Sequence, residues 1–145
     1  MRRERRTMLL VCLVILVPCV LVGWHCVRLQ QYRQEFAPLL DRARSLMMGT
    51  ATPAPSEEQD GSLYDDLRFR QDLYPDIVRI DVSKLDITDA EIHGDEAVLT
   101  VDYAYSQYRA DGSVFGTASI QGEKWYAKRT NAGWKVYRVV PRYIG

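Results

Sequence analysis

The sequence predicts an α+β fold in which an N-terminal transmembrane helix and further amphipathic helices precede a curved antiparallel β-sheet. Three observations lead to this prediction. Residues 8–27 form a long apolar run behind a basic start. Apolar residues recur at three- and four-residue spacing within residues 29–48 and 63–74. From residue 77 onward the apolar spacing changes to two, which is typical of strands.

The apolar run Met8–Val27 carries no formal charge apart from a titratable His25. A helix of about 20 residues at 1.5 Å per residue spans roughly 30 Å, the thickness of a bilayer core. Four arginines precede the run within residues 1–7, and positive residues beside a membrane span stay in the cytoplasm. We therefore predict a single-pass signal anchor in the cell membrane, with a basic cytoplasmic tail (1–7) and an extracytoplasmic C-terminal part.

A cleaved signal peptide and a lipoprotein signal are the two alternatives to an anchor. A cleaved signal peptide has an apolar stretch of about 7–15 residues and a small-residue cleavage site. The present run is longer, and the residues after it (VRLQQYRQEF) offer no such site. A lipoprotein signal is a third option because Leu16–Cys19 loosely resembles a lipobox, but Pro18 directly before the cysteine fits it poorly.

Composition excludes several kinds of site. Removing the first 27 of 145 residues leaves 118, which suits one domain with a modest core. The three cysteines all lie in the apolar run, and His93 is the only histidine beyond it, so we expect neither disulfides nor a metal or cofactor. The acidic cluster Asp60, Asp65 and Asp66 lacks a recognised ligand spacing. Basic residues are scattered through the strands, so nucleic-acid binding is not expected.

The segment between the anchor and the sheet has three parts. Residues 28–48 predict a juxtamembrane amphipathic helix that Pro38 either kinks or divides in two. Residues 49–62 are rich in proline, hydroxyl and acidic side chains, which indicates a flexible linker or a loop within one domain. A short amphipathic helix over residues 63–74 then opens the extracytoplasmic domain, residues 63–145.

The C-terminal half reads as a meander. Short turns containing Asn, Asp or Gly separate the predicted strands, and Gly116 and Gly122 indicate bends or bulges that curve the sheet. The predicted strands are Ile77–Val82, Lys84–Ile92, Ala97–Tyr108, Val114–Lys128 and Trp134–Tyr143.

Strand alternation predicts which side chains face the core. One face carries Ala97, Leu99, Val101, Tyr103 and Tyr105 and should point inward. Asp102 then points outward and should be exposed. We also expect Trp134 to be buried and Lys135 to be exposed.

Short motifs carry a family resemblance. Gly94–Val101 (GDEAVLTV), Lys124–Tyr126 (KWY) and Gly133–Val136 (GWKV) resemble the strands of an NTF2-like domain, a cystatin-like α+β cone, over about residues 63–145. Membrane-anchored members of that superfamily, similar to VirB8 and TcpC, serve as extracytoplasmic assembly modules. Its isomerases and dehydratases place Asp, or Asp and His, inside the cone as general base. Here Asp102 is expected to face outward and the last three strands contain no histidine, so no catalytic residue is predicted.

The strands concentrate aromatic side chains. Arg138 joins them because it shares strand parity with Trp134 and is expected to lie inward. The candidate pocket or interface consists of Tyr103, Tyr105, Trp125, Tyr126, Trp134 and Arg138. These side chains either pack the core or form an exposed contact patch.

We predict a non-enzymatic, membrane-anchored module for protein–protein assembly in a secretion, conjugation or cell-envelope complex, with the lipid bilayer, protein partners or further copies of the chain as its contacts. The alternative is a small-molecule-binding or catalytic domain that uses the cone interior. An open pocket with several converging polar groups would favour the alternative. A cone filled by side chains would favour assembly.

Helix pairing in the membrane is a testable expectation. Cys12, Cys19 and Cys26 recur every seven residues, which returns a helix to within about 20° of its starting direction. The stripe is either a dimer seam or a set of tolerated small residues. If it is a seam, mild oxidation of membranes should yield a reducible dimer that Cys26→Ser abolishes and Cys12→Ser does not, because Cys26 lies nearer the oxidising side. Accessible thiols that never cross-link would remove the seam.

Overall fold

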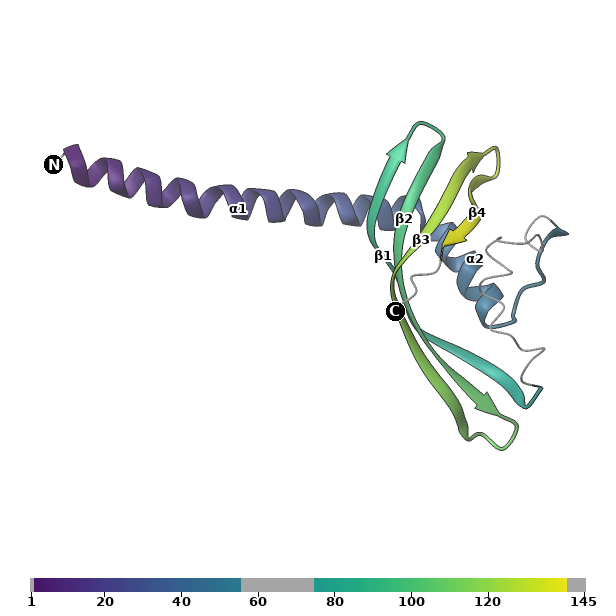
Figure 1. Ribbon diagram of the computed structural model, residues 1–145. Coiled ribbons are helices and arrows are strands. Elements are labelled where there is room, and N and C mark those ends of the chain that lie inside the picture. Colours follow the sequence, from purple (N-terminus) through teal and green to yellow (C-terminus); the bar gives the residue numbers. More distant parts are fainter. Residues whose placement is uncertain (1, 56–74, 141–145) are drawn as a thin grey trace.

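The computed structural model describes the backbone of residues 2–55 and 75–140, and the side chains of these residues from Leu16 onward. Helices α1 (Arg2–Glu35) and α2 (Ala37–Met47) precede strands β1 (Ile77–His93), β2 (Glu96–Arg109), β3 (Val114–Thr130) and β4 (Gly133–Val140). Figure 1 shows α1 projecting from the folded part and α2 on the concave side of the sheet. The expected helix over residues 63–74 and the acidic cluster around Asp60 lie outside the described residues.

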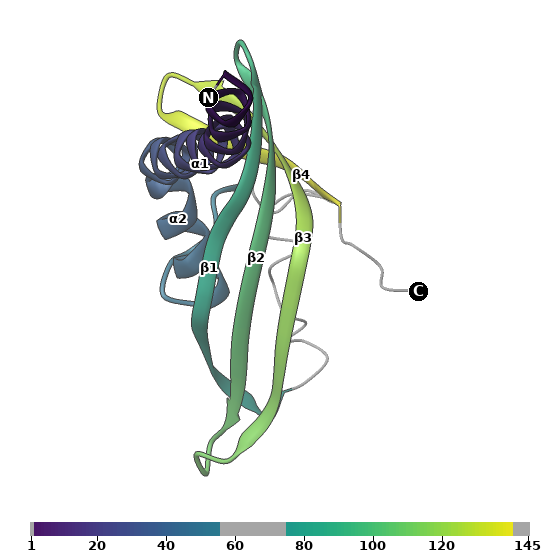
Figure 2. The same cartoon turned by 90° about the vertical axis from the view of Figure 1, so that its left-hand side faces the viewer.

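The sheet is an antiparallel meander with strand order β1-β2-β3-β4, which confirms the predicted α+β fold. β1 is one strand where two were expected, because the predicted break at Ser83 is a register shift between Val82 and Lys84 that leaves the pairing intact. Gly122 has φ 70° and lies at a bulge, as predicted. A second shift in β3 lies beside Gly116. These irregularities accompany the strong curvature seen in Figure 2.

The helical segment is divided in two, which decides between the alternatives left open at Pro38. α1 ends at Glu35, Phe36 caps α2 with φ −97° and ψ 6°, and Pro38 lies in the first turn of α2. Proline is tolerated there because its missing N–H would have no helical partner in any case. The break turns the chain onto the concave face, and both helices contact β1 while α2 also reaches β4.

One hydrophobic cluster joins the helices to the sheet. Phe36, Ile87, Leu99, Val101 and Trp125 are fully buried. α2 contributes Leu39, Ala43, Leu46 and Met47 to the same cluster. The predicted inner face of β2 is confirmed, since Ala97, Leu99, Val101 and Tyr103 are buried and Tyr105 is partly buried.

Three burial expectations are corrected. Trp134 is only partly buried, because it lies at the end of the sheet with its ring 5.1 Å from that of Phe36. Lys135 is partly covered. Asp102 faces outward but is only 16% exposed, since Lys84 Nζ lies 3.0 Å from its carboxylate. Burial raises the pKa of Asp102, but hydrogen bonds from the Gly122 N–H and from Lys84, with the positive charge of Lys84, hold it below its usual range.

The expectation that Arg138 lies inward is wrong. β4 pairs Val136 with Ala127 but Arg138 with Tyr126, so a register shift inserts one residue between these pairs. The bulge reverses the strand parity that the sequence suggested. As a result Val139 is buried and Arg138 is exposed.

The expected membrane helix corresponds to part of α1, and only its residues from Leu16 onward have described side chains. Residues 8–27 lie within α1, and residues 8–15 are helical without described side chains. Among the residues whose side chains are described, no helix is long and apolar enough to cross a membrane.

Leu99 provides a test of the core. Leu99→Ala should lower the free energy of unfolding of the full chain by about 2–5 kcal/mol, because it leaves a cavity at a fully buried site. Denaturant unfolding followed by tryptophan fluorescence measures this loss. Val78→Ala, at a side chain that is 61% exposed, is the control and should change stability by about 0.5 kcal/mol or less. Equal effects of the two variants would contradict the assigned core.

Candidate functional site

The inner face of the sheet holds a buried carboxylate that the sequence analysis missed. Glu123 is 4% exposed and alternates along β3 with the buried Trp125 and Ala127. Trp125 Nε1 donates to Glu123 Oε1 over 2.7 Å, and the Tyr103 hydroxyl lies 3.2 Å from Glu123 Oε2. Alternation with Trp125 was the available signal, because every second residue of a strand shares its face.

These donors explain how an acidic side chain is accommodated among apolar neighbours. Buried carboxylates require hydrogen-bond donors, and Glu123 receives one at each oxygen. Tyr105 stacks beside Tyr103 with ring centroids 6.4 Å apart, and burial raises the pKa of the Tyr105 phenol. The carboxylate therefore fixes the positions of Tyr103 and Trp125 within the core.

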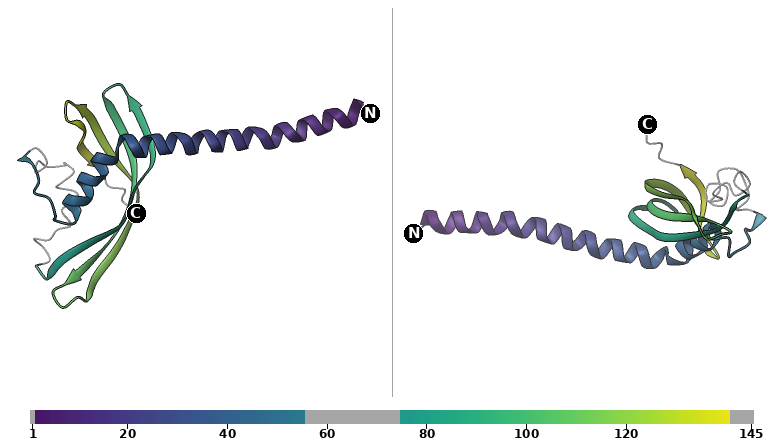
Figure 3. Two further views of the ribbon diagram at one scale, coloured as in Figure 1. Left: turned by 180° about the vertical axis from the view of Figure 1, so that it is seen from behind. Right: turned by 90° about the horizontal axis from the view of Figure 1, so that it is seen from below.

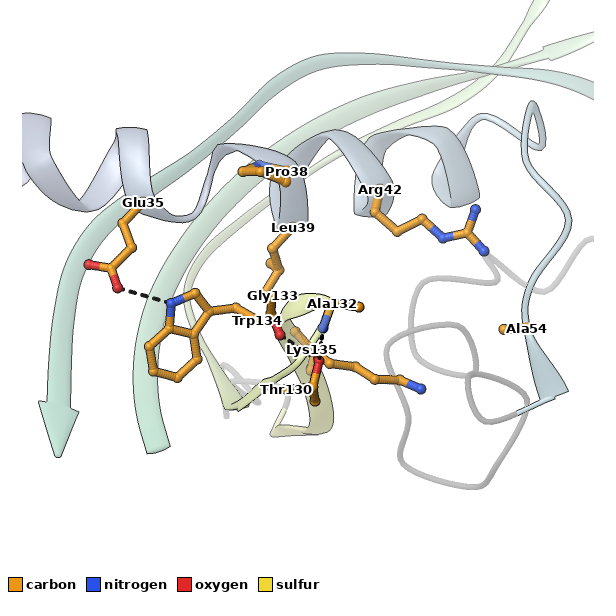
Figure 4. Close-up of a pocket in the computed structure, with 11 residues that line it drawn as sticks. Glu35, Pro38, Leu39, Arg42, Ala54, Thr130, Ala132, Gly133, Trp134 and Lys135 are labelled. Atoms are coloured by element: carbon orange, nitrogen blue, oxygen red, sulfur yellow. Dashed lines mark hydrogen bonds between the residues drawn. The ribbon is translucent and has the colours of Figure 1, made fainter. Parts of the chain in front are cut away.

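A groove of about 430 Å³ lies elsewhere, between the junction of the two helices and the β3–β4 hairpin. Figure 4 shows Trp134 and Leu39 approaching each other from opposite sides of it. Pro38, Leu39 and Trp134 give it an apolar lining, and Glu35, Arg42 and Lys135 supply charge. The groove thus combines an aromatic side chain with groups of both signs.

Glu35 binds two side chains at one end of this groove. Its Oε1 accepts hydrogen bonds from Trp134 Nε1 at 3.0 Å and from Arg129 Nη2 at 2.8 Å. The Arg129 guanidinium also lies over the Trp134 ring, 4.7 Å from its centroid. These contacts join residues 94 and 99 positions apart in the chain. The orientation of Trp134 is therefore set by its neighbours on three sides, including Phe36.

The cations lie at the other end of the groove. In Figure 4 the Arg42 guanidinium and the Lys135 ammonium both point away from Glu35. Arg42 Nη2 donates to the carbonyl of Thr52 over 2.8 Å, which ties the end of α2 to the chain that follows. The groove therefore has an acidic end that is neutralised by Arg129 and a basic end at Arg42 and Lys135.

The predicted aromatic set divides among three places. Tyr103, Tyr105 and Trp125 lie on the inner face, and Trp134 lines the groove. Tyr126 lies on the outer face with Arg138 5.4 Å from its ring centroid, beside the exposed Tyr137. The set is consequently not one contiguous patch. Of the predicted seam, Cys19 and Cys26 are free and exposed on α1, and the side chain of Cys12 lies outside the described residues.

Comparison with known proteins identifies the fold. No protein-family model and no curated protein sequence matches the chain. An NTF2-like superfamily protein from Salmonella enterica serovar Typhimurium has a similar structure, with 16% identity, a TM-score of 0.50, and coverage of 80% of this chain and 92% of that one. The intermembrane space region of the chloroplast protein ARC6 gives 11% identity, a TM-score of 0.49, and coverage of 79% and 97%. The likeness to the Salmonella protein shows that the chain has the NTF2-like fold that its motifs predict.

The buried carboxylate provides a stability test. Glu123→Gln should lower the free energy of unfolding by about 1–3 kcal/mol, because one amide oxygen cannot replace two carboxylate acceptors at the same positions. Glu96→Gln, at an exposed site on β2, is the matched control. Denaturant unfolding of both variants measures the difference. If Glu123→Gln costs no more than Glu96→Gln, the carboxylate does not organise the inner face.

Proposed function

We propose that this protein is a non-enzymatic, membrane-anchored module that mediates protein–protein assembly outside the cytoplasm. The observation that carries the proposal is the groove at Trp134, which opens beside the helix junction while the inner face beneath the helices is filled. Phe36, Leu99 and Trp125 leave no exposed surface there. An NTF2-like fold by itself is compatible with many functions, so the proposal rests on these features of this chain.

The anchor is supported by the sequence and by the exposure of α1. The side chains of α1 between residues 16 and 27 project without partners in the folded part, as Figures 1 and 3 show for the helix itself. The large apolar side chains exposed there are Leu16, Val17, Val20, Leu21, Val22, Trp24 and Val27. Such exposure in water is unfavourable, and a bilayer accommodates an apolar helix of this length.

The boundary of the proposed anchor also has suitable chemistry. Arg28 lies 5.5 Å from the Trp24 ring centroid and 5.4 Å from that of Tyr32, and its Nε donates to the Tyr32 hydroxyl. Trp and Tyr favour the headgroup level of a membrane, and arginine reaches it with its charged end. This placement supports a membrane surface just beyond Val27, with the groove on the extracytoplasmic side.

The groove suits a protein segment with an apolar anchor and acidic neighbours. Trp134 is held in one orientation, so binding costs little side-chain entropy, and tryptophan and arginine are prominent at interface centres. Arg42 and Lys135 provide positive charge at one end. By analogy, the assembly role resembles that of VirB8 and TcpC. The expected partner is a protein segment with an apolar anchor residue and acidic neighbours.

The alternative function is a small-molecule or catalytic role for the cone interior. Glu123 and the Tyr103 hydroxyl would be its polar groups. Both are engaged in the core, and the neighbouring Trp125 is fully buried. These contacts favour a structural role for the carboxylate over proton transfer to a ligand.

The assembly role can be tested in the native membrane with the full chain. A photoreactive residue at Ala132, on the groove, should cross-link one discrete protein, whereas the same residue at Ala110, in the exposed β2–β3 turn, should not. Trp134→Ala should reduce the Ala132 cross-link at least tenfold. A cross-link of equal yield at both positions, or one that survives Trp134→Ala, would contradict the proposal.

The same membranes test the anchor. A reporter fused after Gly145 should be active only outside the cytoplasm, and the mature chain should retain its N-terminal residues. Detection of a processed form beginning near Val27 or Arg28 would contradict anchoring. It would not affect the outcome of the cross-linking test at the groove.

A further inference from the structure

The convex outer face of the sheet lies on the same side as the proposed anchor. Figures 1 and 3 show the strands running across the direction of α1, with their convex side toward the N-terminus and α2 on the concave side. Figure 2, seen from the side on which the N-terminus lies, looks onto this outer face. Transmembrane helices run within about 40° of the bilayer normal. An anchor in α1 therefore turns the outer face toward the membrane.

The outer face also lies close to the proposed membrane boundary. α1 continues without a break from Val27 to Arg33, a step of six residues that covers about 9 Å at 1.5 Å per residue. Arg33 pairs with Asp86 of β1 at 2.5 Å, and Asp86 is the cross-strand partner of Asp102 on the outer face. The headgroup layer adds about 5–7 Å to each side of the bilayer core. Long side chains on the outer face are therefore within reach of the headgroups.

Basic and aromatic side chains gather on this face along β3 and β4. Three side chains of β3 alternate with buried ones and so point outward. On β4, Arg138 is the cross-strand partner of Tyr126, and the ring centroids of Tyr137 and Tyr126 are 6.4 Å apart. Tyr137 is 50% exposed. The outer patch consists of Lys124, Tyr126, Lys128, Tyr137 and Arg138.

The outer patch carries an excess of positive charge. Its three cations have one acid among their described cross-strand partners, Glu96 opposite Lys128. Asp102, also on the outer face, is paired with a cation outside the patch, because Lys84 Nζ lies 3.0 Å from its carboxylate. The patch is therefore complementary to an anionic surface.

We propose that the outer face rests on the headgroup layer of the bilayer that holds α1, with the outer patch against anionic lipid headgroups. The inference rests on the anchor in the proposed function. Lysine and arginine bind phosphate oxygens through charge-assisted hydrogen bonds, and an anionic surface attracts each of them. Tyrosine favours the headgroup level because its ring is apolar and its hydroxyl is polar. The bilayer is preferred to a protein because rotation of the chain about α1 leaves this face toward the membrane.

This placement gives the two sides of the sheet different contacts. The outer face meets lipid, whereas the concave side, which carries α2, faces away from the bilayer. The groove beside the helix junction then stays accessible to a protein segment. Attachment through both α1 and the outer face fixes the orientation of the sheet relative to the membrane.

Cross-linking to lipid tests the placement in nanodiscs that contain the full chain alone. The bilayer mixes anionic phosphatidylglycerol with phosphatidylcholine, photoreactive benzoylphenylalanine replaces one side chain at a time, and mass spectrometry quantifies the lipid adducts. Tyr137 reports on the outer patch, and Leu21 reports on the anchor. Met48, 37% exposed at the end of α2, is the control on the concave side. The adduct at Tyr137 should exceed that at Met48 at least tenfold, and Leu21 should also give an adduct.

Charge removal tests the role of the headgroups independently. With the photoreactive residue at Tyr137, Lys128→Gln with Arg138→Gln should lower the lipid adduct at least threefold, because two cations facing the anionic headgroups are lost. Arg79→Gln with Arg109→Gln removes the same charge at the far end of the β1–β2 pair and should leave the adduct unchanged.

Circular dichroism establishes that each variant is folded. Raising the salt concentration from about 0.05 M to about 1 M should also lower the adduct of the unaltered patch, because screening weakens the attraction. This measurement decides the question if the glutamine pair does not fold.

The three positions separate this inference from the proposed anchor. An adduct at Leu21 with none at Tyr137, or equal yields at Tyr137 and Met48, overturns the placement while the anchor stands. A Tyr137 adduct that responds neither to the glutamine pair nor to salt also overturns the proposal. Absence of an adduct at Leu21 contradicts the anchor itself, and the placement fails with it.

Discussion

The structure depends on packing the helix junction against the inner face of the sheet. Phe36 interrupts the helical segment and is fully buried in the cluster that contains Leu99, Val101 and Trp125. Without that burial α2 would lack tertiary support, and a helix of this length is marginal alone. The same packing carries Glu35 to the end of the sheet, where Arg129 and Trp134 bind it. The groove is therefore a consequence of where the core places the helix break.

Unequal strand lengths give the sheet two different ends. Where β4 pairs with β3, the sheet has four strands and packs against the helices. Along the part of β3 that precedes Lys124, the described sheet consists of β1, β2 and β3 alone. Figure 1 shows this part curving away from the helices. Gly122 permits this change, because its positive φ allows a bulge and its N–H donates to Asp102. One end of the sheet thus supplies the groove.

The buried carboxylate illustrates why fold likeness does not decide chemistry. Glu123 lies on the concave side, the side on which NTF2-like enzymes hold their acidic residues. Its two oxygens, however, are bound by Tyr103 and Trp125 in a packed region. Removing the charge would leave buried donors unsatisfied, so the carboxylate is explained by the core itself. The structural relatives share the fold at low identity, and that likeness leaves the function to the particular surfaces of this chain.

The sequence by itself determined the order of elements, the antiparallel meander and the inner face of β2. These follow from local periodicity, turn residues and proline chemistry, which act over a few neighbouring residues. A bend or bulge at Gly122 is predicted for the same reason, and the structure has a bulge there. The division of the helix at Phe36 was one of two outcomes that Pro38 allowed, and only the packing of Phe36 chose between them.

Only the tertiary structure decided which residues meet. One inserted residue in β4 reversed the facing of Arg138, and strand parity cannot reveal such a shift without the partner strand. Glu35 and Trp134 are 99 residues apart, and no periodicity links them. The point at which β4 stops pairing with β3, at Lys124, is likewise a property of two strands together. Local patterns fix the elements and their faces, whereas sites and edges arise from long-range packing.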